Sequence, residues 1–164
     1  MPCDSFGIEL PQRKTNRIPG YDYSAPNAYF VTICTDKRRN LFWRDVGAVI
    51  GRPQDVPLNH IGSLVAQAIG NIHTHYPVVT VEHYVIMPNH VHILLQIHAD
   101  DNGRPMAAPT IPQVINQLKG IATKKAGFPL WQKGFYDHVI RSDSDFRDAW
   151  NYIEGNPGKW TEET

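Results

Sequence analysis

Residues 78–98 of the chain read VVTVEHYVIMPNHVHILLQIH. Two runs rich in β-branched and aromatic residues flank Pro88-Asn89 in this stretch, and this pattern predicts a β-hairpin. In the second run, apolar residues occupy every other position: Val91, Ile93, Leu95 and Ile97. Because successive side chains of a strand point to opposite faces, this apolar side is predicted to rest on helices. The opposite side carries His90 and His92.

The segments on either side of the hairpin complete the predicted fold. Residues 28–35 (AYFVTICT) predict a first strand, and residues 129–140 predict a fourth. Asn59 and Thr110 each precede an apolar stripe at helical spacing, so each is predicted to cap a helix. The resulting order, β-α-β-β-α-β, predicts an α+β, ferredoxin-like fold. In this fold an antiparallel sheet carries two helices on one face and leaves the other face open.

A further helix is predicted near the C-terminus. Ser142 and Asp145 have the spacing of a helix start, and Gly155 and Pro157 are expected to end the helix. Four residues form its predicted inward stripe: Phe146, Ala149, Trp150 and Ile153.

Size and composition predict one domain. The chain has 164 residues, of which 41% are hydrophobic and 20% charged. We expect an irregular, proline-containing basic arm at residues 1–27 and a single domain at residues 28–164. The sequence contains no run of about 18 apolar residues, which argues against a membrane protein. Cys3 and Cys34 are too few for a disulfide scaffold or a cysteine zinc site, so we expect a cytoplasmic protein.

The formal net charge is zero, but the charges are unevenly distributed. Residues 1–44 hold seven Lys or Arg against four Asp or Glu, and residues 104–141 hold six against one. Such segments can hold a phosphate backbone, although solvated surface charge explains them equally well. The candidate DNA-contacting residues are Arg13, Lys14, Arg17, Tyr21, Tyr23, Lys119, Lys124, Lys125 and Arg141.

His90 and His92 are candidate metal ligands. Residues two apart on one strand face lie about 6.6–7 Å apart, so both imidazoles can converge on one ion. Two histidines alone make an incomplete site, and a pair of polar histidines on a half-exposed strand is the simpler interpretation. His73 and His75 have the same spacing but lie near a helix end, where they point in different directions. His138 is a candidate for approaching the open sheet face.

Four sequence blocks resemble one known family. Residues 84–94 (YVIMPNHVHIL) resemble the signature of the IS200-like transposases, which are single-tyrosine endonucleases with a His-hydrophobic-His motif. Residues 130–141 (LWQKGFYDHVIR) and 151–157 (NYIEGNP) are similar to a second signature, that of the branch associated with repetitive extragenic palindromes (REP). Residues 17–32 resemble the start of that branch. The resemblance covers roughly residues 13–160.

The resemblance implies specific roles. His90 and His92 would bind a divalent metal, Mg²⁺ or Mn²⁺, and Asn156 would be the third ligand. Tyr152, on the C-terminal helix, would be the nucleophile. The implied partner is single-stranded or hairpin DNA, bound by a monomer or a homodimer. The implied activity is metal-dependent nicking and rejoining of DNA through a 5′-phosphotyrosine, in a transposase or a host-adopted enzyme.

Elementary chemistry agrees with these residue types. A phosphotyrosine ester keeps the energy of the broken phosphodiester bond, so strands can be rejoined without ATP. A phenol with a pKa of about 10 is a weak nucleophile at neutral pH, so metal assistance is needed. Tyr136 is the rival nucleophile. The alternative function is a non-catalytic, ferredoxin-like nucleic-acid-binding module that stacks bases on Tyr21, Tyr23, Tyr29 and Trp43.

Overall fold

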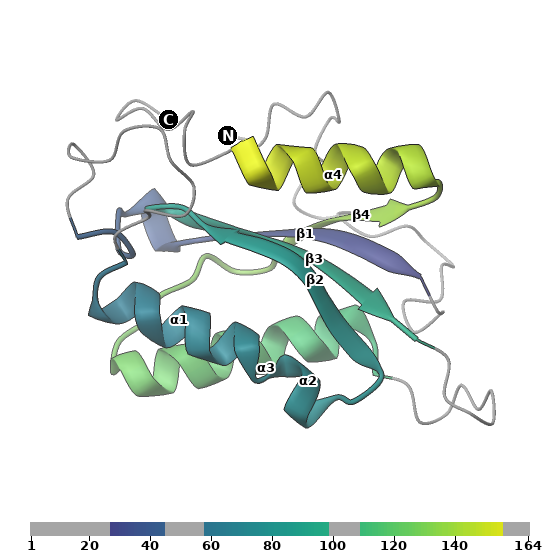
Figure 1. The fold of residues 1–164 in the computed structure, drawn as a ribbon. Coiled ribbons are helices and arrows are strands. Elements are labelled where there is room, and N and C mark those ends of the chain that lie inside the picture. Colours follow the sequence, from purple (N-terminus) through teal and green to yellow (C-terminus); the bar gives the residue numbers. More distant parts are fainter. Residues whose placement is uncertain (1–26, 45–57, 99–108, 156–164) are drawn as a thin grey trace.

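The structure is a computed structural model that describes residues 27–44, 58–98 and 109–155 (Figure 1). Its sheet is built from antiparallel strands: β1 (Ala28–Cys34), β2 (Val79–Ile86), β3 (His90–Ile97) and β4 (Tyr136–Ile140). The strand order is β2-β3-β1-β4, so β3 and β1 are central and β2 and β4 form the edges. The arm expected at residues 1–27 lies, apart from Asn27, outside the described residues.

Helices cover both faces of this sheet. The first two helices are α1 (His60–Gly70) and the short α2 (Ile72–His75), and the later ones are α3 (Ile111–Ala126) and α4 (Asp143–Gly155). Figure 1 shows α1 and α3 on one face and α4 on the other. The predicted ferredoxin-like order is confirmed, but the face expected to be open is covered by α4. Phe30 and Leu94 make that face apolar, and both are buried there.

The predicted alternation along β3 is confirmed. Val91, Ile93, Leu95 and Ile97 are all at most 1% exposed. They lie on the face that α1 and α3 cover, and their burial supplies much of the hydrophobic stabilisation of that layer. Among the described residues, none of the helices combines the length and the hydropathy needed to cross a lipid bilayer.

The predicted helix starts are present as hydrogen-bonded caps. The Asn59 side chain accepts a hydrogen bond from the backbone N–H of Gly62 at 2.8 Å. Thr110 and Gln113 form a reciprocal capping box at the start of α3. At α4, the Ser142 hydroxyl accepts a hydrogen bond from the backbone N–H of Asp145 at 3.0 Å. Local sequence therefore set all three helix starts.

The fourth strand is shorter than predicted. We expected it at residues 129–140, but β4 begins at Tyr136. Trp131 forms only an isolated bridge to Thr35, and Gly134 has a φ of 79°. A residue in this left-handed conformation cannot continue a strand, so the segment before β4 is irregular.

Gly62 provides a test of how α1 is placed. A Cβ at Gly62 would overlap the backbone carbonyl of Phe42, which also accepts the Asn59 N–H at 2.9 Å. We expect Gly62→Ala to lower the free energy of unfolding by about 1–3 kcal/mol, because the backbone has to move. Chemical denaturation measures this change.

Gly120 is the matched control for Gly62. It lies inside α3, where an added Cβ meets nothing within 4 Å. Gly120→Ala should raise the free energy of unfolding by roughly 0.5–1 kcal/mol, because alanine loses less backbone entropy in a helix. Equal effects at the two glycines would contradict the close approach of α1 to Phe42.

Candidate functional site

The structure brings His90 and His92 together on the α4 face of β3. Their ring centroids are 4.7 Å apart, and the two residues are 1% and 0% exposed. They are buried because β3 is a central strand, flanked by β1 and β2, with α4 above it. The sequence-based expectation that the two imidazoles share one face is confirmed.

One nitrogen of each ring has a defined partner. His92 Nδ1 lies 2.9 Å from the Thr32 hydroxyl, and Thr32 is paired with His92 across the sheet. His90 Nδ1 lies 2.7 Å from Asn89 Oδ1, so this ring nitrogen donates to the amide oxygen. The Asn89 amide in turn donates to the carbonyl of Arg38 at 3.4 Å. These contacts fix how the rings are oriented.

The second ring nitrogen of His92 fits a metal ligand. Its Nε2 is buried and has no hydrogen-bond partner among the residues that the structure describes. A buried polar atom without a partner is costly, and a metal ion satisfies an imidazole nitrogen of this kind. The described residues contain no cluster of three or more His, Cys, Asp or Glu side chains. Asn156, the third ligand implied by the resemblance, lies outside the described residues.

Electrostatics keep both rings neutral. Burial lowers the pKa of His90 to about 3, and the positive charge of Arg38 contributes to this shift. Burial, followed by the neighbouring His90, holds the pKa of His92 well below its ordinary value. At neutral pH both imidazoles are therefore in the form that binds metal ions.

Tyr152 lies against His92, one of the two histidines. Its ring centroid is 5.2 Å from that of His92 and 5.9 Å from that of Phe30, both in edge-on geometry. Thr32 on β1 is paired with His92 on β3 and with Tyr136 on β4, so the rival Tyr136 lies in the same cross-strand row as His92. Two strand spacings, about 9.5 Å, separate the backbones of Tyr136 and His92. The structure therefore places Tyr152, rather than Tyr136, in ring contact with His92.

Polar contacts hold α4 above the sheet at two points. His138 Nε2 donates to Asp145 Oδ2 at 2.9 Å, and His83 Nε2 donates to Glu154 Oε1 at 2.7 Å. His138, a candidate from the sequence for approaching this face, thus does so. The contact of His83 with α4 was not predicted from the sequence. The Trp150 ring, expected to face inward, is 37% exposed and stacks on His83 at 4.3 Å.

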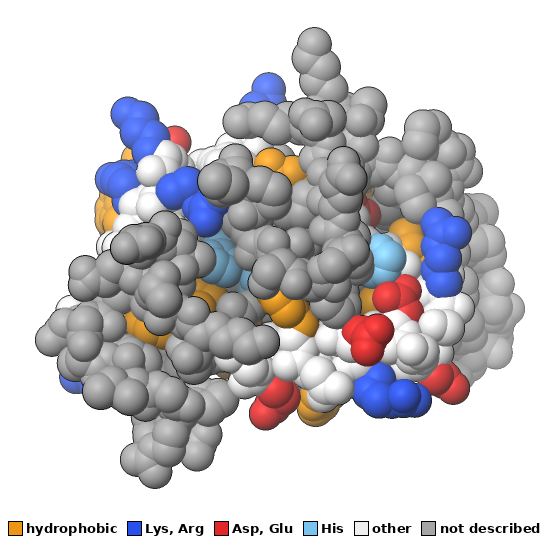
Figure 2. Space-filling view, turned by 90° about the horizontal axis from the view of Figure 1, so that it is seen from above, with side chains coloured by type: hydrophobic (Ala, Val, Ile, Leu, Met, Phe, Trp, Pro, Cys, Tyr) orange, Lys and Arg blue, Asp and Glu red, His pale blue; other side chains and the backbone are white. Residues whose placement is uncertain are grey.

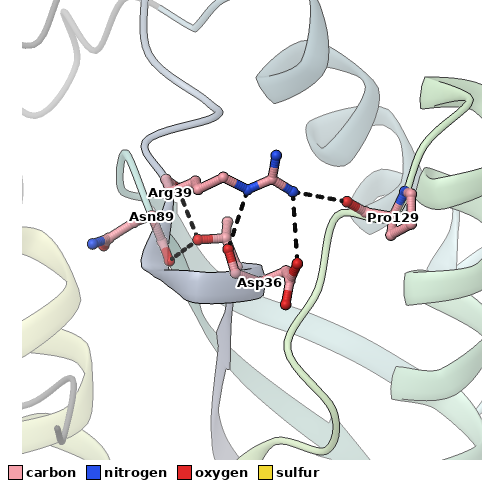
Figure 3. A network of polar contacts seen from close by, with 5 residues as sticks. Asp36, Arg39, Asn89 and Pro129 are labelled. Carbon is pink, nitrogen blue, oxygen red and sulfur yellow. Dashed lines mark hydrogen bonds and ion pairs between the residues drawn. The ribbon is translucent and has the colours of Figure 1, made fainter.

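The basic residues that follow β1 form a turn whose backbone conformation the sequence did not predict. Lys37 and Arg38 both adopt positive φ, 56° and 57°, which is strained for residues other than glycine. Figure 3 shows the contacts that hold this turn, including the Arg39 guanidinium donating to the carbonyl of Pro129 at 3.2 Å. The Thr35 hydroxyl donates to the carbonyls of Arg39 and Asn89. Lys and Arg are not residue types that favour positive φ, so the sequence held no signal for this feature.

The predicted basic residues do not gather at the histidine pair. Lys119 donates from Nζ to the carbonyls of Gln132 and Gly134 at 3.0 and 2.9 Å, so it ties α3 to the loop before β4. Lys124 and Lys125 occupy the last turn of α3, on the face of the sheet opposite to α4.

The remaining DNA-contact candidates are only partly visible. Arg141 is exposed between β4 and α4. Five further candidates lie outside the described residues: Arg13, Lys14, Arg17, Tyr21 and Tyr23. Figure 2, which looks onto the α4 side, shows several Lys and Arg side chains grouped beside a histidine. This side of the molecule thus carries positive charge near histidine.

The chain has sequence relatives among known proteins. No family model matches the chain. An uncharacterised protein of Haemophilus influenzae is 29% identical over 177 residues, covering 96% of this chain and 95% of the relative. A second protein of that organism, named "Putative REP-associated tyrosine transposase", is 26% identical over 146 residues, covering 84% of this chain and 74% of the relative.

A solved structure extends the comparison to the fold. The structure of a REP-associated tyrosine transposase bound to a REP hairpin superposes with a TM-score of 0.64 at 20% identity. The match covers 87% of this chain and 73% of that structure. The resemblance indicated by the sequence blocks is confirmed, and the chain is related to the REP-associated tyrosine transposases.

Proposed function

We propose that this chain is a metal-dependent enzyme that nicks and rejoins single-stranded or hairpin DNA through a 5′-phosphotyrosine on Tyr152. The observation that carries the proposal is the contact between Tyr152 and His92, whose buried Nε2 has no hydrogen-bond partner among the described residues. A non-catalytic binding module has no need of a tyrosine beside such a nitrogen. This contact therefore favours the enzyme over the binding module.

His90 and His92, together with Asn156, are the proposed ligands of a divalent ion, Mg²⁺ or Mn²⁺. When bound, the ion supplies polarisation of the scissile phosphate and offsets the charge that develops there. Thr32 and Asn89 hold the Nδ1 atoms of the two rings, which leaves Nε2 of each ring as the nitrogen for the ion. The low pKa values of both rings remove competition from protons near neutral pH.

Tyr152 performs the covalent step. Its hydroxyl oxygen attacks phosphorus, and the bond between phosphorus and the 3′ oxygen of the preceding nucleotide breaks. The phenol loses its proton and the departing 3′ oxygen gains one, so a free 3′ hydroxyl and a phosphotyrosine result. Rejoining is the reverse attack by a 3′ hydroxyl. The number of phosphoester bonds is unchanged at each step, so the cycle requires no ATP.

We propose that the DNA contacts come from the basic arm and from exposed basic residues of the folded domain. The arm residues are Arg13, Lys14, Arg17, Tyr21 and Tyr23, and those of the folded domain are Lys124, Lys125 and Arg141. The hairpin bound by the solved relative supports this class of partner. We withdraw Lys119 from the set, because its ammonium group already donates to two backbone carbonyls.

The nucleophile is tested by Tyr152→Phe, with Tyr136→Phe as the matched control. Tyr152→Phe keeps the ring that packs on Phe30 and His92, so binding of hairpin DNA and Mn²⁺ should survive. Nicking and covalent adduct should both disappear, because phenylalanine has no oxygen to attack phosphorus. Tyr136→Phe should retain most adduct on a labelled hairpin in a denaturing gel. The reverse pattern would make β4, not α4, the source of the nucleophile.

The metal ligands are tested by His90→Ala and His92→Ala. Each should abolish cleavage in Mn²⁺ while leaving most hairpin affinity, because the ion acts on the scissile phosphate and not on the rest of the duplex. A His73→Ala/His75→Ala double variant is the control, since those residues lie on α2, away from the pair, and it should cleave normally. Full activity of His90→Ala in the presence of a chelator would exclude the metal role.

Thr32→Val tests how the His92 ring is held. The substitution keeps the shape but removes the hydroxyl that contacts Nδ1, so Mn²⁺ affinity should fall roughly 10–100-fold. Thr80→Val is the control, because the Thr80 hydroxyl contacts the exposed His98 at 2.9 Å instead. Counting free Mn²⁺ by electron paramagnetic resonance measures both affinities. Identical affinities for the two variants would show that the Thr32 contact does not prepare a metal ligand.

A further inference from the structure

One row of paired residues crosses the sheet beneath α4. His138 on β4 is paired with Phe30, Phe30 with Leu94 on β3, and Leu94 with His83 on β2. Directly paired residues point to the same face of a sheet, and Phe30 contacts Tyr152 from that face. The row therefore begins and ends with a histidine, one on each edge strand, on the side that α4 covers.

Each of these histidines forms a hydrogen bond with a carboxylate at one end of α4. His138 Nε2 lies 2.9 and 3.1 Å from the two carboxylate oxygens of Asp145, in the first turn of the helix. His83 Nε2 lies 2.7 Å from Glu154, in the last turn, and its ring is stacked beneath Trp150. Both histidines are partly exposed, so neither is a core residue.

The helix and the sheet have matching dimensions. Asp145 and Glu154 are nine residues apart, which is about 13.5 Å along a helix axis. Three strand spacings separate the two edge strands, which is about 14 Å. The helix is thus long enough for Asp145 to reach His138 on one edge strand while Glu154 reaches His83 on the other.

The apolar contacts of α4 cannot set its position by themselves. Ala149 and Ile153 are its buried residues, and hydrophobic contact has little directional preference. Hydrogen bonds at the two ends are directional, so they resist both rotation of the helix and sliding along its axis. Tyr152 lies between these ends, with its ring on Phe30 and His92. A small rotation of α4 would move the hydroxyl away from the histidine pair.

We propose that His83 and His138 are positioning residues, which hold α4 from the two sheet edges so that Tyr152 faces His90 and His92. The inference rests on the proposed function for its catalytic consequence. Neither histidine contacts the reacting atoms in this assignment. Their contribution is to the geometry of the nucleophile, not to metal binding or to DNA affinity.

The first test compares His83→Ala and His138→Ala with His98→Ala in the full chain. His98 directly follows β3 and also has a side-chain hydrogen bond, but its partner is Thr80 on β2 and not α4. Adduct formation on a labelled hairpin in Mn²⁺, measured with excess protein, should slow about tenfold in the first two variants, as expected for loss of one charge-assisted hydrogen bond. Hairpin and Mn²⁺ affinities should not change. His83→Gln and His138→Gln should regain much of the rate, because the glutamine amide can donate to the same carboxylate.

Two results of that test would overturn the proposal. One is an unchanged adduct rate in both alanine variants. The other is a parallel loss of rate, hairpin affinity and Mn²⁺ affinity, which is the signature of a residue that only stabilises the fold.

The second test needs no activity. Amide hydrogen exchange of residues 143–155 should become about tenfold faster in each alanine variant, with α1, α3 and β3 unchanged, because one end of α4 is released. Unchanged exchange in α4 overturns the positioning role, whatever the adduct assay shows. The two proposals can also be separated. If the unsubstituted protein forms no adduct with any hairpin but α4 exchanges faster in the alanine variants, the two contacts are supported and the proposed function is wrong.

Discussion

The central strand β3 is buried on both faces, and this burial governs how the helices and the histidine pair are arranged. A strand in the middle of a covered sheet has no water on either side, so every polar group on it needs a partner within the protein. On one side of β3 the side chains are apolar and pack on the layer of α1 and α3, so no polar side chain there needs a partner. The side beneath α4 carries His90 and His92. Their Nδ1 atoms contact Asn89 and Thr32 respectively, and Nε2 of His92 suits a metal ion.

The same constraint links stability to the proposed chemistry. Without α4 the histidines would be solvated and Tyr152 would have no fixed position. With α4 in place, the imidazoles stay neutral and the tyrosine ring packs on one of them. One helix therefore closes the apolar surface formed by Phe30 and Leu94 and also delivers the proposed nucleophile. This double role explains why α4 is held by polar contacts at its ends as well as by its buried residues.

Much of the fold could be predicted because its signals are local. The alternation in residues 90–97 marks the two faces of β3, and Asn59, Thr110 and Ser142 act as caps through hydrogen bonds within their own first turn. The fourth strand was predicted too long, because Gly134, a residue type that favours positive φ, was included in the strand. The contacts of Lys119 with two carbonyls that lie 13 and 15 residues further along the chain could not be predicted from local sequence.

Residue patterns predicted the order of the elements, the strand face that carries the histidines and, through resemblance, Tyr152 as the candidate nucleophile. They did not predict that Tyr152 lies on His92, that Tyr136 lies two strands away from His92, or that His83 and His138 contact the two ends of α4. The difference lies in the range of the interactions. Caps and alternation act between near neighbours, whereas the contact between His83 and Glu154 joins residues 71 positions apart and exists only once the sheet has formed.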